Sequence, residues 1–143
     1  MARRGWGRDG ARGQAIVEFA IAFPVFLVMM LGLLEGGRLV WSYVTLSHAV
    51  QEGGRTAVLA DTSGESAVKS KVVAAAGPLT VATGNVTIKV TDKSSGTTKG
   101  FRARDVGDRV EVKATFAFTP VVTSLFGGKT TLTLTGSTEL MVE

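Results

Sequence analysis

One carboxylate lies at the start of a long apolar segment, where a charged side chain is costly. Residues 19–34 are sixteen consecutive uncharged residues, and Glu18 directly precedes them. Counted from Gln14, the stretch to Leu34 covers 21 residues, or roughly 31 Å of helix, which is long enough to cross a bilayer core. An ionisable side chain in such a segment is by default a candidate functional group. The alternative is that Glu18, near one end of the segment, only extends its carboxylate to the membrane surface.

The other side chains offer little catalytic chemistry. His48 is the only histidine and the chain has no cysteine, so no nucleophile–histidine pair or metal-ligand spacing is apparent. His48 lies in a predicted helix, which favours a packed or interfacial role. The string Gly127-Gly128-Lys129-Thr130 is similar to the end of a phosphate-binding loop, but Thr123 stands where the first glycine is required. We expect no enzyme activity, no catalytic residue, no metal and no cofactor.

Most of the net positive charge lies before the apolar segment. The chain has a net charge of +4, of which the first thirteen residues supply +3 through four arginines and one aspartate (Arg3, Arg4, Arg8, Arg12 and Asp9). Basic residues next to an apolar helix hold that end in the cytoplasm, so residues 38–143 are predicted to lie across the membrane. The later basic residues are scattered rather than clustered, which disfavours a nucleic-acid partner.

Three kinds of amino-terminal segment are compatible with this composition. A secretory signal peptide has an apolar core of about 7–15 residues and a small-residue cleavage site. Here the core is longer, and Glu35-Gly36-Gly37-Arg38 follows it without such a site. An uncleaved signal anchor explains the apolar segment equally well, although it gives Glu18 no role. The third kind is a prepilin-type leader.

The string Arg12-Gly13-Gln14-Ala15-Ile16-Val17-Glu18-Phe19 resembles the site that prepilin peptidases cut in type IV pilins. The resemblance implies cleavage between Gly13 and Gln14, which makes Glu18 the fifth mature residue and Phe19 the aromatic residue after it. Cleavage would create an amino group at Gln14, one helical turn from Glu18, and a nearby opposite charge favours the ionised carboxylate. The partner of Glu18 is then its own amino terminus or that of a neighbouring subunit.

The pattern predicts a long helix with two different halves. Residues 14–37 are the predicted transmembrane half, which contains Pro24 and a pair of small residues, Gly32 and Gly36, suited to close helix packing. Residues 38–60 are the predicted amphipathic half. Its apolar stripe has steps of four and three and leaves out Ser42, Glu52 and Arg55, and its members are Leu39, Tyr43, Leu46, Val50, Gly53 or Gly54, and Ala57. The glycine pair lowers helix propensity, so a break there is one alternative.

Beyond residue 60 the sequence predicts a second helix and then a sheet. Residues 65–77 carry a second apolar stripe and end at Gly77-Pro78. Residues 85–143 are β-rich: apolar residues alternate over 86–90 and 110–118, and a third strand over 131–143 is predicted to be interrupted at Gly136. Residues 93–104 are rich in Ser, Thr and Gly and predict an exposed loop. The expected fold class is α+β, with the long helix packed on a small antiparallel sheet.

The chain as a whole resembles TadE-like pseudopilins, the minor pilin-type proteins of tight-adherence (Flp) type IV pilus systems. The resemblance is carried by the Gly13–Phe19 string, Pro24, the Glu35–Arg38 string, and Ala49-Val50-Gln51-Glu52-Gly53-Gly54-Arg55-Thr56-Ala57. Gly54 stands where the family often has Ala. Residues 110–120 and 131–139 also fit the family pattern.

The resemblance implies a bacterial inner-membrane protein with a basic leader (residues 1–13), a transmembrane helix (14–37) and a periplasmic α+β domain (38–143), with a place in the extracellular pilus left open. It further implies a prepilin peptidase, other Tad pilin-type subunits and the assembly platform as partners, and a role in building a pilus for surface attachment. The alternative that stays open is an uncleaved single-span envelope protein whose β-rich domain binds a ligand.

Overall fold

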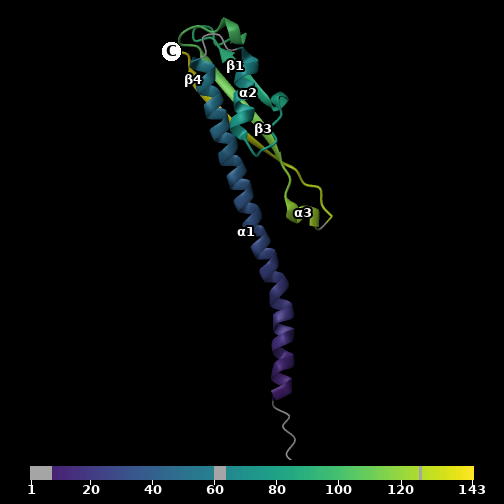
Figure 1. Cartoon of the computed structure of the whole chain (residues 1–143). Coiled ribbons are helices and arrows are strands. Elements are labelled where there is room, and N and C mark those ends of the chain that lie inside the picture. Colours follow the sequence, from purple (N-terminus) through teal and green to yellow (C-terminus); the bar gives the residue numbers. More distant parts are fainter. Residues whose placement is uncertain (1–7, 60–63, 126) are drawn as a thin grey trace, which may run out of the picture. The chain divides into compact units, whose positions relative to one another are not determined.

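The computed structural model describes residues 8–59, 64–125 and 127–143, which form two units, Met1–Gly37 and Arg38–Glu143. The elements, labelled in Figure 1, are α1 (Arg8–Leu59), α2 (Glu65–Ala76), η1 (Thr83–Asn85), β1 (Val86–Thr91), β2 (Thr98–Lys99), η2 (Phe101–Ala103), β3 (Arg109–Phe118), α3 (Val121–Leu125) and β4 (Leu132–Met141). A long apolar helix is followed by a small antiparallel sheet that packs against its second half, so the predicted α+β class is confirmed.

The sheet has four antiparallel strands in the order β2-β1-β3-β4. Its register places Val86 opposite Ala114, Ile88 opposite Val112, and Val90 opposite Val110, so these apolar residues share one face. Polar residues such as Thr87 and Lys113 occupy the other face and are exposed. The period-two pattern therefore predicted β1 and β3 correctly, because each strand buries one face only.

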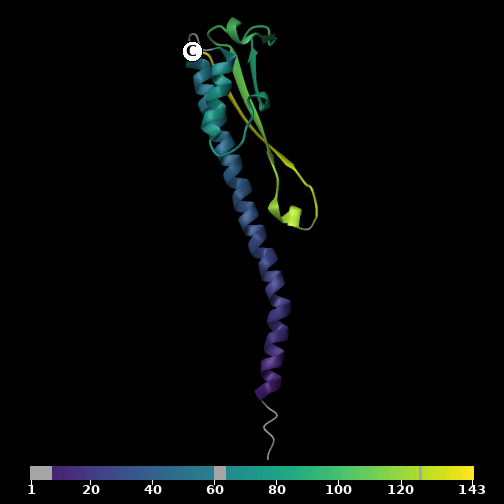
Figure 2. The same cartoon turned by 45° about the vertical axis from the view of Figure 1, so that its right-hand side comes forward.

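Residues 38–59 of α1 and the helix α2 cover the apolar face of this sheet. The two helices lie side by side in both views (Figures 1 and 2). From α2 the core receives Val68, Val72 and Ala76, which are fully buried, as the predicted stripe requires. From α1 it receives Leu46, Ala49, Val50 and Ala57, which are also fully buried.

The predicted stripe of α1 is wrong at its first turn. Tyr43 was placed on the buried side, yet it is 50% exposed, whereas Ser42, which was placed off the stripe, is only 5% exposed. The buried stripe thus begins at Ser42, one residue before the predicted Tyr43. From Leu46 onward the buried and predicted stripes agree. A small serine permits close packing here, and the large amphipathic tyrosine remains at the surface.

The glycine pair does not break α1, because both glycines lie where the helix is packed most closely. A Cβ atom added to Gly53 would collide with Val72 Cγ2 of α2, and one added to Gly54 would lie 2.7 Å from Thr138 Cγ2 of β4. Gly136, the predicted interruption of the third strand, lies inside β4 instead. A Cβ there would lie 3.3 Å from Leu46 Cγ, so the strand continues through Gly136, which leaves room for the helix.

The segment 93–104, predicted to be a loop, contains two short elements, β2 and η2. Phe101 is 8% exposed, so it fixes η2 to the core. This part of the prediction was wrong because it rested on the polar composition of the segment. Composition does not reveal a strand of two residues or a single buried aromatic residue.

A buried carboxylate organises the connection between β1 and β3. Asp108 is fully buried and accepts hydrogen bonds from the backbone N–H groups of Asp105 (2.8 Å) and Lys93 (3.1 Å). Its other polar neighbour is the Lys99 ammonium group, at 3.2 Å, which also contacts Asp105 and Asp92. Each carboxylate therefore has donors or a cation beside it, as buried charges require.

Candidate functional site

The predicted cleavage and pairing residues lie at the beginning of the described chain. Gly13 and Gln14 belong to α1, and residues 1–7 of the predicted leader lie outside the described residues. The Gln14 side chain donates a hydrogen bond from Nε2 to Glu18 Oε1 at 3.0 Å. Residues 14 and 18 are thus within reach of one another across one helical turn. The cleavage at Gly13 and the pairing role of Glu18 remain predictions.

The helix that follows Glu18 has a largely exposed apolar surface. Most of the large apolar side chains from residue 16 to residue 34 are between 39% and 78% exposed, and Leu27 and Leu31 are half-buried. The rings of Phe19 and Phe23 stack with their centroids 5.2 Å apart. Within the described residues, this helix is the one element long and apolar enough to cross a membrane, which suggests membrane anchoring.

The two small residues predicted to allow helix packing are fully open. A Cβ atom added to Gly32 or Gly36 would have no neighbouring atom within 4 Å. Since the residues are four positions apart, they lie on one side of the helix. A second helix can approach this side closely, and whether one does remains a prediction.

Among the described residues, His48 is not part of a metal-binding group. His48 was expected to be packed or interfacial; it is exposed on α1, which excludes the packed alternative and leaves the interfacial one. In the part of the chain that the structure describes, no three His, Cys, Asp or Glu residues are placed to hold a metal ion.

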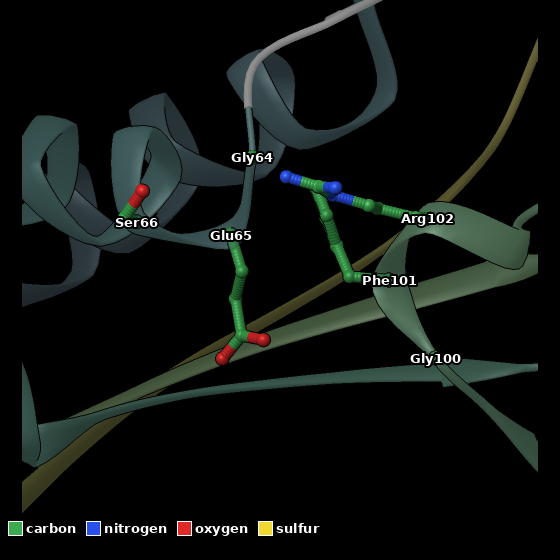
Figure 3. A pocket seen from close by; sticks show the side chains of 6 residues that line it. All are labelled: Gly64, Glu65, Ser66, Gly100, Phe101 and Arg102. Carbon is green, nitrogen blue, oxygen red and sulfur yellow. The ribbon is translucent and has the colours of Figure 1, made fainter.

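One surface pocket lies between the start of α2 and η2 (Figure 3). It has a volume of about 450 Å³ and is lined by Gly64, Glu65, Ser66, Gly100, Phe101 and Arg102. The Arg102 guanidinium group extends toward Gly64, whereas the Glu65 carboxylate points away from it. The pocket offers one cation to a ligand and, among its lining residues, no histidine or second base beside Ser66.

The sequence did not predict the contact that joins the first residue of the second unit, Arg38, to the sheet. The Arg38 guanidinium carbon lies 5.1 Å from the centre of the Phe118 ring, in the range of cation–π attraction. Arg38 is the first charged side chain after Glu35, and Phe118 is the last residue of an alternating strand. These positions could be noted in the sequence, but the contact between the two residues depends on the tertiary fold.

A small α+β domain preceded by one apolar helix is typical of a protein anchored in a membrane by a single span. A family model described as TadE-like protein matches residues 13–55, which confirms the predicted resemblance over that segment. The match covers 43 of the 143 residues, and over that segment the chain is similar to a structural family associated with tight-adherence pili. The similarity noted in the distal strands lies outside the matched segment. No curated protein and no solved structure matches the chain.

Proposed function

We propose that this chain is a TadE-like minor pilin or pseudopilin that acts in the assembly of a tight-adherence pilus for surface attachment. Its role is structural, with no catalytic step of its own. The observation that carries the proposal is the family match over residues 13–55, which includes the predicted cleavage site, Glu18 and the whole apolar segment. In this proposal the apolar helix holds the protein in the inner membrane, and residues 38–143 are periplasmic.

Glu18 has a specific function in the proposal. After cleavage by a prepilin peptidase, the new amino group of Gln14 pairs with the Glu18 carboxylate of the same or a neighbouring subunit. The 3.0 Å bond from Gln14 Nε2 to Glu18 Oε1 supports this role, because the Glu18 carboxylate extends toward residue 14, one helical turn away. In the low-dielectric environment of a membrane, an unpaired carboxylate is strongly disfavoured, so correct pairing favours one register between subunits.

The state of the amino terminus tests the processing step. Intact-mass measurement and N-terminal sequencing of the protein from its native host should give a mature chain that starts at Gln14. A chain that starts at Met1 or Ala2 would contradict the proposal. It would favour the alternative of an uncleaved envelope protein, for which the pocket beside Arg102 is the candidate ligand site.

Substitution of Glu18 tests the pairing step. Glu18→Ala should leave membrane insertion intact, because the apolar segment is unchanged, and should strongly reduce assembly, measured as surface pili by electron microscopy. Gln14→Ala is the matched control: it removes the side-chain hydrogen bond but keeps an amino group at position 14 after cleavage. Normal assembly in Glu18→Ala, or equal defects in the two processed variants, would refute pairing through the amine.

A further inference from the structure

The β3–β4 hairpin extends beyond the rest of the sheet. β1 pairs with β3 only from Arg109 to Ala114, whereas the pairing of β3 with β4 continues to Phe118 and Leu132. The last four residues of β3 and the first four of β4 therefore form a two-stranded ribbon, which carries α3 beyond its end in both views (Figures 1 and 2). A two-stranded ribbon has little stability by itself. Phe118 is buried and Phe116 and Leu134 pack against the core, so the part of the hairpin that needs an explanation is its end beyond Phe118.

The end of the ribbon lies at the level where α1 enters the second unit. Three contacts establish this order along the helix: Leu140 lies beside Gly54, Gly136 lies beside Leu46 and Val50, and Phe118, which pairs with Leu132, contacts Arg38. Residues nearer the start of β4 therefore lie beside residues nearer the start of α1. Arg38 is four residues after Leu34, the last apolar residue before Glu35, or roughly 6 Å of helix.

Exposed aromatic residues mark the same level of α1. Trp41 is 52% exposed and Tyr43 is 50% exposed, and both follow Arg38 within five residues. Trp and Tyr concentrate where a membrane protein passes through the headgroup region, because their rings are apolar and their polar groups are hydrated. The level of Arg38 to Tyr43 is therefore suited to the membrane surface.

The end of the hairpin combines exposed apolar side chains with positive charge. Val121 is 59% exposed and Leu132 is 43% exposed. From residue 112 to residue 138 the chain has two basic residues, Lys113 and Lys129, and no acidic residue. Apolar side chains flanked by lysine are favourable against a bilayer with anionic lipids.

We propose that Val121, Lys129 and Leu132, which we call the hairpin tip, form a second contact with the membrane that anchors α1. Val121 and Leu132 enter the boundary between headgroups and acyl chains, and Lys129 pairs with lipid phosphate groups. The contact gives the hairpin tip a packing surface and fixes the sheet at the membrane. It rests on the membrane anchoring of the proposed function but not on leader cleavage or pilus assembly.

Single-cysteine labelling tests this contact in the full-length protein, because the natural chain has no cysteine. Val121→Cys carries a nitroxide label at the hairpin tip. Ser94→Cys carries it at an exposed site beyond the opposite end of β1, and Val25→Cys carries it in the apolar helix. Each protein is reconstituted in bilayers of phosphatidylglycerol and phosphatidylcholine, and electron paramagnetic resonance measures collisions with oxygen and with a water-soluble nickel chelate.

The expected result is that the label at Val121 gains oxygen collisions and loses nickel collisions relative to the label at Ser94. A label at Val121 that matches Ser94, while Val25 reports the bilayer interior, overturns the tip contact and leaves the anchoring intact. If Val25 itself reports water, the anchoring fails and the tip contact with it. Loss of both kinds of collision at Val121 also overturns the proposal, because it indicates a protein neighbour such as a second copy.

Lys129→Glu, combined with the label at Val121, tests the charge. It should restore nickel collisions at Val121 in bilayers with phosphatidylglycerol and change them less in pure phosphatidylcholine. Equal collisions with and without Lys129→Glu in the anionic bilayers would overturn the assignment of Lys129 to lipid phosphate.

Discussion

At the scale of single residues, two adjacent glycines permit α1 to approach both of its neighbours. Gly53 faces α2, where Val72 occupies the space that a side chain would need, and Gly54 faces Thr138 and Leu140 of β4. Glycine costs about 1 kcal/mol of helix propensity relative to alanine at each position. The close packing offsets this cost, and α1 therefore continues through Gly53 and Gly54 although glycine disfavours a helix.

Gly53→Val should destabilise the protein by about 2 kcal/mol, because overpacking a close contact typically costs about 1–3 kcal/mol and Val72 is itself restricted in its rotamers. Gly37→Val is the matched control, since the space around Gly37 is open. Thermal unfolding of the purified full-length proteins in detergent, followed by circular dichroism, provides the comparison. Equal transitions for Gly53→Val and Gly37→Val would show that the helices separate at little cost.

At the scale of elements, the connection between β1 and β3 depends on ionised carboxylates. Hydrogen bonds from Lys99 and then from the backbone N–H groups of Ser95 and Ser94 hold the pKa of Asp92 well below its usual range. The N–H of Asp105, more than any other group, lowers the pKa of Asp108. Contact with Asp92 in turn raises the pKa of Lys99. The three charges therefore favour the folded state together.

The lowered pKa values fix the sign of the pH dependence. A carboxylate with a lower pKa in the folded state contributes stability above its ordinary pKa of about 3.9 and loses that contribution as the pH falls through its folded value. Stability should therefore change little between about pH 5 and 9 and fall below about pH 4. Circular dichroism melting temperatures across this range measure the loss.

Asp108→Asn should lower the melting temperature at neutral pH and reduce the further loss in acid, because the buried carboxylate that titrates is gone. Asp105→Asn serves as the control, since the Asp105 side chain is 74% exposed and should contribute less. An Asp108→Asn variant with the same acid dependence as the natural protein would show that other carboxylates dominate.

The elements with a strong periodic pattern were predictable, and those that depend on distant contacts were not. The alternation in β1 and β3 and the apolar stripe of α2 identified buried faces correctly, because each face is repeated along one segment. The burial of Ser42 in α1 and the continuation of β4 through Gly136 depend instead on how closely the helix and the sheet approach one another. The Asp108 cluster and the Arg38–Phe118 contact join residues far apart in the sequence, so only the fold reveals them.

At the scale of the whole molecule, α1 belongs to both units, and the second unit depends on it. Leu46 and Val50 are fully buried there, and burying one such side chain contributes about 1.5–3 kcal/mol. Small domains have a net stability of about 5–15 kcal/mol. Burial of these two side chains alone thus contributes a free energy comparable to a large part of the net stability of a small domain.

A fragment of residues 38–143 should therefore fold and unfold cooperatively, whereas a fragment of residues 64–143 should be largely unfolded. Dispersion of amide signals in nuclear magnetic resonance spectra distinguishes the two states. Comparable dispersion in the shorter fragment would mean that α2 and the sheet form a core without α1.

The strand order gives the sheet two very different borders. On one side β2 has only two residues, too few to template another strand. On the other side β4 has ten residues and, within the described chain, a strand neighbour on one side only. Such a border invites strand addition from a second molecule, which natural proteins oppose with charged side chains. The charged side chain of β4 is Glu139, which lies 3.5 Å from Arg109 of β3, so Glu139→Gln should increase aggregation of concentrated protein through pairing of β4 edges.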